Sequence, residues 1–146
     1  MTHRAESIVS AVVTTLTGLT TTGSNVFRGR VYAVPDASLP ALCVYQGEDK
    51  IIGQYSQAKY DCAITITVEA LVKTSSTQVD TTLNTIREEV VEALQADYTQ
   101  GLAYVLNTIE GDTSAPELSG EGDKPSAAVR MEWQFHYRRS RTDPGA

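Results

Sequence analysis

The end of the chain shows the clearest alternation of apolar and polar side chains. From residue 127 to residue 137, every second side chain is apolar or aromatic, and those between are mostly polar or charged. A period of two is typical of a β-strand with one buried face and one face toward solvent. The predicted buried face consists of Ala127, Val129, Met131, Trp133, Phe135 and Tyr137.

A second segment, 60–72, alternates in the same way and predicts another strand. Its thirteen residues exceed the usual five or six, so this strand could project beyond its own core. Its apolar face would carry Tyr60, Cys62, Ile64, Ile66, Val68 and Ala70. Shorter strands are predicted at 26–32, at the apolar segment 41–45 and at 101–110.

Two further segments repeat their apolar residues every three or four positions, which is the spacing of an amphipathic helix. The first covers 3–18 and ends at a glycine, a common residue at a helix C-terminus. The second covers about 77–96, and Ser76 or Thr77 could cap its first turn. Its apolar stripe would consist of Val79, Leu83, Ile86, Val90 and Leu94.

The order of these elements is typical of an α+β fold. We expect two helices packed on one face of a largely antiparallel, mixed sheet, in a single domain over residues 1–146. Polar, glycine-containing stretches predict mobile loops at about 46–57 and 111–126, the second with a short edge strand near its middle. The ends of the chain, 1–3 and 139–146, are expected to be flexible.

Charge and cysteine content narrow the classes of partner. The formal net charge is −6, which argues against nucleic acid as the main partner because phosphate binding requires clustered positive charge. Cys43 and Cys62 lie in predicted strands without metal-ligand spacing, and we interpret them as reduced core residues of a cytoplasmic protein. We expect neither a secretion signal nor a membrane helix, because no sufficiently long apolar run occurs.

A search for catalytic motifs finds none of the common ones. The sequence lacks a G-x-S-x-G elbow, a G-x-x-x-x-G-K-[ST] phosphate loop and an H-E-x-x-H helix. His136 lies on the polar side of the last strand, where a surface residue is the simpler interpretation than a catalytic base. The acidic stretch 110–123 lacks the alternating oxygen ligands of a calcium loop. We therefore expect no enzymatic activity, no cofactor and no metal.

Clustered arginines are the main candidate for a functional surface. They could form a solubilising edge that prevents unwanted strand pairing. They could instead be a docking surface that binds carboxylates of a neighbouring subunit. The basic candidates are Arg138, Arg139 and Arg141, with Arg28 and Arg30 as further members.

The same chain also offers acidic side chains that could meet these arginines. A protein with both kinds of surface can pair head to tail with its own copies, and such a contact closes into a ring when the rotation permits. The sequence alone does not decide whether the two surfaces meet. The acidic candidates are Glu48, Asp49, Glu117, Glu121 and Asp123.

Three stretches together resemble the tail terminator proteins of long-tailed bacteriophages, the minor tail protein U type. They are HRAESIVSAVVTTLTGLTTTG (3–23), NVFRGRVYAVPDASLPALCVYQGED (25–49) and MEWQFHYRRSRTDP (131–144). The resemblance runs nearly from end to end. It implies a small α+β subunit that assembles as a six-membered ring on the head-proximal end of the tail tube.

According to this resemblance, the ring stops the addition of tube subunits and provides the surface for head attachment. Its partners would be other copies of the chain, the tail tube protein and a head completion or connector protein. DNA would pass through the lumen without specific binding, and the protein would reside in the virion after assembly in the host cytoplasm. Charge reversal at Arg138 and Arg139 should then weaken ring formation or tube capping.

The alternatives are another neck or tail-completion (head–tail joining) protein, the tail tube subunit and, from a different class, a small enzyme or ligand-binding domain.

Overall fold

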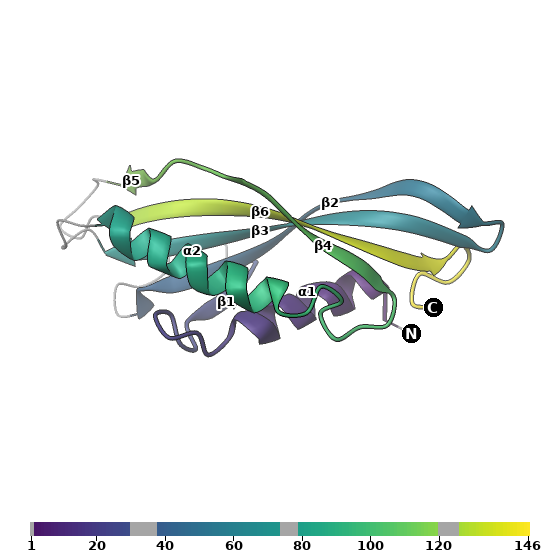
Figure 1. The fold of residues 1–146 in the computed structure, drawn as a ribbon, viewed down its shortest axis with the longest axis horizontal. Coiled ribbons are helices and arrows are strands. Elements are labelled where there is room, and N and C mark those ends of the chain that lie inside the picture. The colour runs from purple at the N-terminus through teal and green to yellow at the C-terminus, as the bar shows by residue number, and fades with distance from the viewer. Residues whose placement is uncertain (1, 30–37, 74–78, 120–125) are drawn as a thin grey trace.

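A computed structural model describes residues 2–29, 38–73, 79–119 and 126–146. It contains two helices and six strands (Figure 1). In chain order these are α1 (Arg4–Leu16), β1 (Val26–Arg28), β2 (Ala41–Ser56), β3 (Lys59–Lys73), α2 (Val79–Gln95), β4 (Val105–Thr113), β5 (Glu117–Ser119) and β6 (Ser126–Ser140).

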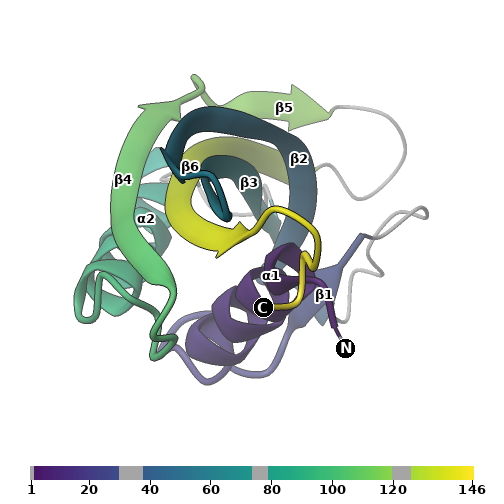
Figure 2. The same ribbon diagram turned by 90° about the vertical axis from the view of Figure 1, so that its right-hand side faces the viewer.

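All six strands belong to one sheet with the order β1-β2-β3-β6-β4, and β5 pairs with β6 beyond the end of β4. The β1–β2 pair is parallel, and every other pair is antiparallel. A view along the long axis shows the strands curling, with both helices on one side of them (Figure 2). The predicted α+β fold with a mixed, largely antiparallel sheet is therefore confirmed.

The core lies between the two helices and the face of the sheet that carries every second side chain of the long strands. All six residues predicted for the buried face of β6 are buried, and Trp133, Phe135 and Tyr137 are the bulkiest of them. Burying each large apolar side chain contributes roughly 1.5–3 kcal/mol, so this alternation holds the sheet against the helices. The helices contribute Ala5, Ile8, Val9, Val12 and Leu16 from α1 and Leu83, Ile86, Val90 and Leu94 from α2.

The predicted loop at 46–57 is wrong, because β2 continues to Ser56 and pairs with β3 along its length. Residues 46–56 are almost all exposed, so they show no apolar period. Backbone pairing with β3 holds them instead, and three irregularities in register interrupt that pairing.

The predicted strand at 101–110 begins later, at Val105, and β4 runs on to Thr113, inside the stretch predicted as a loop. The turn before β4 is held by the buried side chain of Gln100. Its amide nitrogen donates to the carbonyl oxygen of Leu94 (2.8 Å) and to the hydroxyl of Thr108 (3.1 Å). The predicted short edge strand is confirmed as β5.

Both ends of the chain make defined contacts where flexible segments were predicted. His3 caps α1, since its Nδ1 accepts from the backbone N–H of Ala5 (3.0 Å). β6 extends to Ser140, and the carbonyl oxygen of Pro144 then accepts from the backbone N–H of Arg4 (2.9 Å). The predicted cap at Ser76 or Thr77, and the part of the predicted strand 26–32 beyond residue 29, lie outside the described residues.

Candidate functional site

The predicted arginine cluster lies at the end of the sheet where the β2–β3 hairpin turns. In Figure 1 this hairpin and the end of β6 reach beyond the helices on the right. The register places Arg138 opposite Asp61 and Arg139 opposite Tyr60. The β3–β6 pairing therefore brings the arginines against the base of the hairpin.

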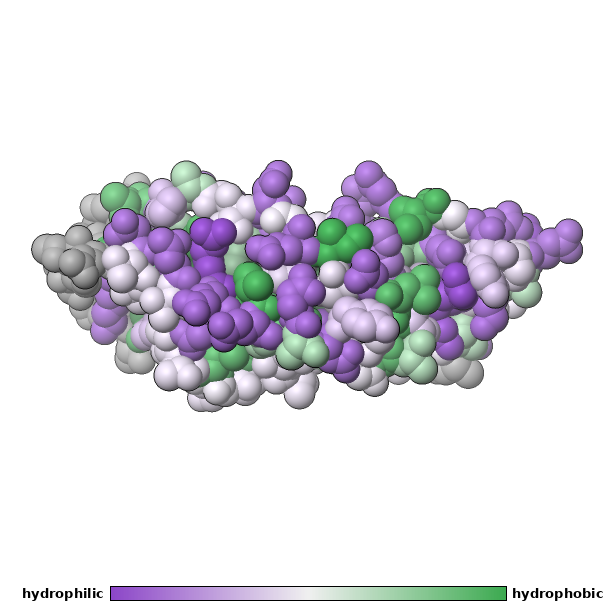
Figure 3. All heavy atoms as spheres, viewed as in Figure 1, coloured by the Kyte–Doolittle hydropathy of each residue, from purple (hydrophilic) through white to green (hydrophobic). Residues whose placement is uncertain are grey.

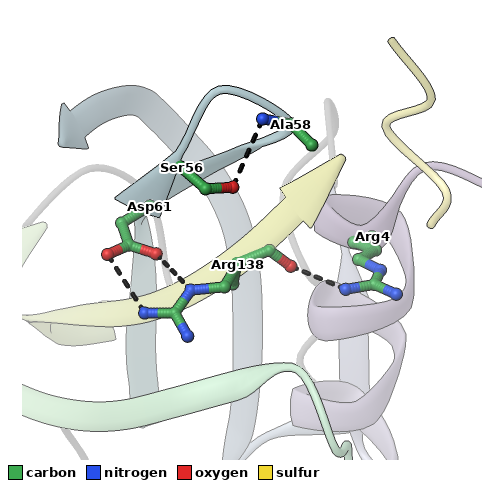
Figure 4. Close-up of polar contacts among 5 residues, drawn as sticks. All are labelled: Arg4, Ser56, Ala58, Asp61 and Arg138. Carbon is green, nitrogen blue, oxygen red and sulfur yellow. Dashed lines mark hydrogen bonds and ion pairs between the residues drawn. The ribbon is translucent and has the colours of Figure 1, made fainter. Parts of the chain in front are cut away.

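Arg138 is held by groups of this same chain. Its guanidinium binds the Asp61 carboxylate through two hydrogen bonds (2.7 and 3.3 Å) and lies 3.5 Å from the centre of the Tyr55 ring. Its carbonyl oxygen accepts from the Arg4 guanidinium (2.7 Å) (Figure 4). Its N–H donates to the Tyr104 carbonyl (3.0 Å). The bond to Asp61 raises the pKa of Arg138. Its charge is thus already neutralised within the subunit.

Sequence reasoning missed the partners of Arg138 although it identified the arginine. Asp61 lies between Tyr60 and Cys62 of the predicted apolar face, which places it on the polar side of the strand. Its pairing with Arg138, however, depends on the register between β3 and β6. Opposite charges near the ends of two long predicted strands were the available signal.

Arg139 and Arg141 make fewer contacts within the described residues than Arg138 does. Their guanidinium carbons lie 5.6 and 5.9 Å from the centre of the Tyr60 ring, and Arg139 also donates to the Ser140 carbonyl (3.1 Å). Within the described part of the chain, neither forms an ion pair with a carboxylate. These two arginines retain positive charge that a partner could neutralise.

Arg28 is held by a different element. Its guanidinium binds both oxygens of Glu6, one of them at 3.0 Å, and so ties β1 to α1. The hydrogen bond lowers the pKa of Glu6. The structure thus assigns Arg28 to an exposed intrachain pair, while Arg30 lies outside the described residues.

The acidic candidates among the described residues do not form one cluster. Asp49, on the projecting part of β2, accepts from the Tyr137 hydroxyl (2.6 Å), and Glu48 lies 3.6 Å from Lys50 on the same strand. Glu117 belongs to β5, which lies at the opposite end of the molecule from the hairpin turn (Figure 1). Glu121 and Asp123 lie outside the described residues. Whether any of these groups contacts a neighbouring subunit stays a prediction.

The sheet face that the helices leave uncovered carries a polar hollow of about 760 Å³. Arg130 of β6 spans part of it and binds Glu69 of β3 (2.8 Å). Sequence reasoning missed this hollow because its residues come from four strands and the segment after β4. Its lining consists of Tyr45, Thr67, Glu69, Asp112, Thr113, Ser114, Arg130 and Glu132.

The described residues form no metal site in this hollow. No group of three or more His, Cys, Asp or Glu side chains in that part of the chain could hold a metal ion. Cys43 and Cys62 are both buried and free of a disulfide, as predicted. The described helices include none that is long and apolar enough to cross a membrane.

Tyr45 provides a pH-dependent test of the hollow. Burial, with smaller contributions from Cys43 and Glu69, raises its pKa to about 12 from the ordinary value of 10.0. The unfolded chain therefore loses this proton first as the pH rises, so folding stability contributed by Tyr45 is complete below pH 10 and is lost between pH 10 and about 12. We expect urea unfolding midpoints to fall less steeply over this range in Tyr45→Phe than in the unmodified protein. Parallel curves would contradict the assigned burial.

Comparison with known proteins supports the fold but names no family. No family model and no curated protein matches the sequence. Among solved structures, the chain is similar to one from a structure titled "Virion of native gene transfer agent (GTA) particle". The TM-score is 0.54 at 13% sequence identity, over 93% of this chain and 88% of that chain. At this identity, the likeness shows a shared fold over nearly the whole length of both chains.

Proposed function

We propose that this chain is a structural protein of a phage-like virion and forms a ring, most simply a hexamer, at the head-proximal end of a tail tube. There it ends tube polymerisation and provides the surface for head attachment. The observation that carries the proposal is a fold shared over 93% of the chain with a chain of a gene transfer agent virion. The resemblance of residues 3–23, 25–49 and 131–144 to tail terminators supports the more specific role.

The directions of the strands support ring formation. Successive neighbours from β2 through β3 and β6 to β4 are antiparallel, so β4 runs opposite to β2. A copy rotated about an axis along the strands would bring its β4 edge to the β2 edge of its neighbour with this alternation unbroken. Such a heterologous contact closes into a ring when the rotation divides the circle evenly.

The uncovered face of the sheet supports passage of DNA through such a ring. This face is polar, and its carboxylates include Glu69 and Glu132. Each of the two β6 arginines that share the face is paired with a carboxylate of β3: Arg130 with Glu69 and Arg138 with Asp61. A lumen lined in this way would offer no free row of cations to hold phosphates.

The tail tube subunit is the second candidate, because of one specific observation. β2 and β3 form a long hairpin that projects beyond the helices (Figure 1). A projecting hairpin is a means by which stacked rings could interlock. The terminator role requires the opposite behaviour, since a cap must not stack on itself.

Electron microscopy of the purified protein, alone and with uncapped tail tubes, tests these roles. We expect six-fold rings at high protein concentration, or rings that form only on tube ends, with one end of each tube capped. Tubes formed by the protein alone would establish the tube-subunit role instead. Uniform monomers that leave both tube ends unchanged would rule out the proposed function.

Charge reversal at Arg139 and Arg141 tests whether these arginines contribute to ring formation or tube capping. We expect Arg139→Glu/Arg141→Glu to weaken capping about tenfold, equivalent to roughly 1.4 kcal/mol, because neither side chain forms an ion pair with a carboxylate among the described residues. The measurement is the protein concentration at which half of the tube ends are capped.

Arg87→Glu, at a half-buried position of α2 away from the hairpin end, is the control for charge reversal and should cap normally. Arg138→Glu is a poorer test than the double variant, since it would also place two acids together at Asp61. Normal capping by the double variant would exclude these arginines as contacts.

A further inference from the structure

The exposed apolar side chains follow the two edges of the sheet. Within the described residues, six large hydrophobic side chains are exposed. Apolar patches stand out among hydrophilic residues on the right-hand half of the surface, the half with the β2–β3 hairpin and the start of β4 (Figure 3). The six are Ile51, Ile52 and Tyr55 of β2, Leu106 of β4, Leu118 of β5, and Tyr98 in the turn before β4, whose carbonyl accepts from Thr108 (2.8 Å).

Among the described residues, the outer sides of β2 and β4 are unpaired next to these exposed side chains. β1 pairs with β2 only as far as Val44, and no described strand pairs with the outer side of β2 from residue 46 to 56. The outer side of β4 likewise pairs with no strand in the described ranges. Open edges with exposed apolar side chains are sites where strands of another chain can add.

The register places the two apolar edges at the same level of the sheet. One row of paired residues crosses the four strands from Ile51 through Cys62 and Tyr137 to Val105. The next residue along each edge strand is Ile52 on β2 and Leu106 on β4, and each lies at an irregularity in register. Their exposed fractions are 51% and 39%. Because β2 and β4 run in opposite directions, Ile52 and Leu106 lie on opposite sides of this row. A neighbour placed beside this subunit would therefore present one to the other with an axial offset of about one residue, roughly 3.3 Å.

The polar residues near this level are compatible with the same contact. Following the paired rows across the sheet, Lys50 on β2 lies level with Asn107 on β4, and Asp49 lies level with Thr108. Like charges directly opposite each other on neighbouring strands are destabilising. Neither of these rows would place like charges opposite each other across the contact.

We propose that the β2 edge of one copy binds the β4 edge of a second copy, with Ile52 packed against Leu106. This inference rests on the proposed function, in which copies stand side by side in a ring, and it specifies which edges meet. The occupant is a second copy because the chain itself carries the complementary apolar edge, within about one residue of the same level and with a strand direction that continues the antiparallel order.

Cysteine cross-linking tests this contact. Ile52→Cys and Leu106→Cys are made as separate variants, mixed at ring-forming concentration and treated with a short thiol-specific bifunctional cross-linker. We expect cross-linked dimers only in the mixture, and in the double variant a ladder that ends at the ring size. The unmodified protein serves as the blank because Cys43 and Cys62 are buried. Leu118→Cys replaces an exposed residue at the far end of the β4–β5 edge and is the matched control, which should not cross-link to Ile52→Cys.

The outcomes separate this inference from the proposed function. Rings without cross-linking in the mixture would overturn the edge contact but leave the proposed function standing. Cross-linking of Ile52→Cys to itself would also overturn it, since two β2 edges would then meet. The expected ladder from a protein that leaves tube ends uncapped would support the contact and reject the terminator role.

Discussion

Replacing Trp133 with alanine is expected to lower the free energy of unfolding by about 3–5 kcal/mol. The side chain is 1% exposed, lies on β6 between Val129 and Tyr137, and belongs to the core that both helices cover. The loss combines the transfer free energy of the removed ring with the cost of the cavity it leaves. Since Trp133 is the only tryptophan of the chain, urea unfolding should be followed by circular dichroism rather than by tryptophan fluorescence.

Two control variants show whether the loss arises from the core. Trp133→Phe should cost less than the alanine variant, because it keeps an aromatic ring and removes an indole N–H that has no hydrogen-bond partner among the described residues. Gln134→Ala changes the next residue, which is exposed on the opposite face, and should change stability by less than about 0.5 kcal/mol. Equal effects of Trp133→Ala and Gln134→Ala would show that β6 does not bury the predicted face.

The parts of the fold that could be predicted from the sequence are those in which burial imposes a period. The alternation in 60–72 and 127–137 identified β3 and β6 and the buried face of each. The three- and four-residue spacing in 3–18 and 77–96 identified the two helices in the same way. In these segments a side chain's environment is decided by which face it lies on, so the pattern is visible without knowledge of the partner strand.

The projecting half of β2 could not be predicted in this way. Residues 46–56 are exposed on both faces, so polar residues and two glycines occur there without a period. What makes the segment a strand is its pairing with β3, which follows it in the sequence and has a clear pattern of its own. The available signal was its position directly before the predicted strand 60–72, where the first strand of a hairpin would lie.

The candidate interaction surface was predictable in its residues but not in its contacts. The sequence identified Arg138, Arg139 and Arg141 as one cluster. It could not separate Arg138 from the other two, because only the β3–β6 register places Asp61 opposite Arg138. The exposed edges at Ile52 and Leu106 were missed for a related reason, since both residues lie where the register is irregular.

The second large effect is expected for Gly111→Ala, which should lower the free energy of unfolding by about 1–3 kcal/mol. A Cβ atom at Gly111 would lie 2.8 Å from the backbone carbonyl oxygen of Glu132, closer than carbon and oxygen normally approach. The clash cannot be relieved by rotating a side chain, because the neighbour is the backbone of β6. Either β4 must shift away from β6 or the pairing between them must weaken, and thermal or urea unfolding would report the loss.

Gly53→Ala is the matched control for this close approach. Gly53 also lies in a strand next to an irregularity in register, but a Cβ added there would meet nothing within 4 Å. Alanine restricts the unfolded chain more than glycine does, so this variant should be neutral or stabilising by up to about 1 kcal/mol. If both variants instead lost stability equally, the cost would come from replacing a strand glycine in general. A Cβ atom at Gly111 of β4 would then lie farther from the Glu132 carbonyl oxygen of β6 than 2.8 Å.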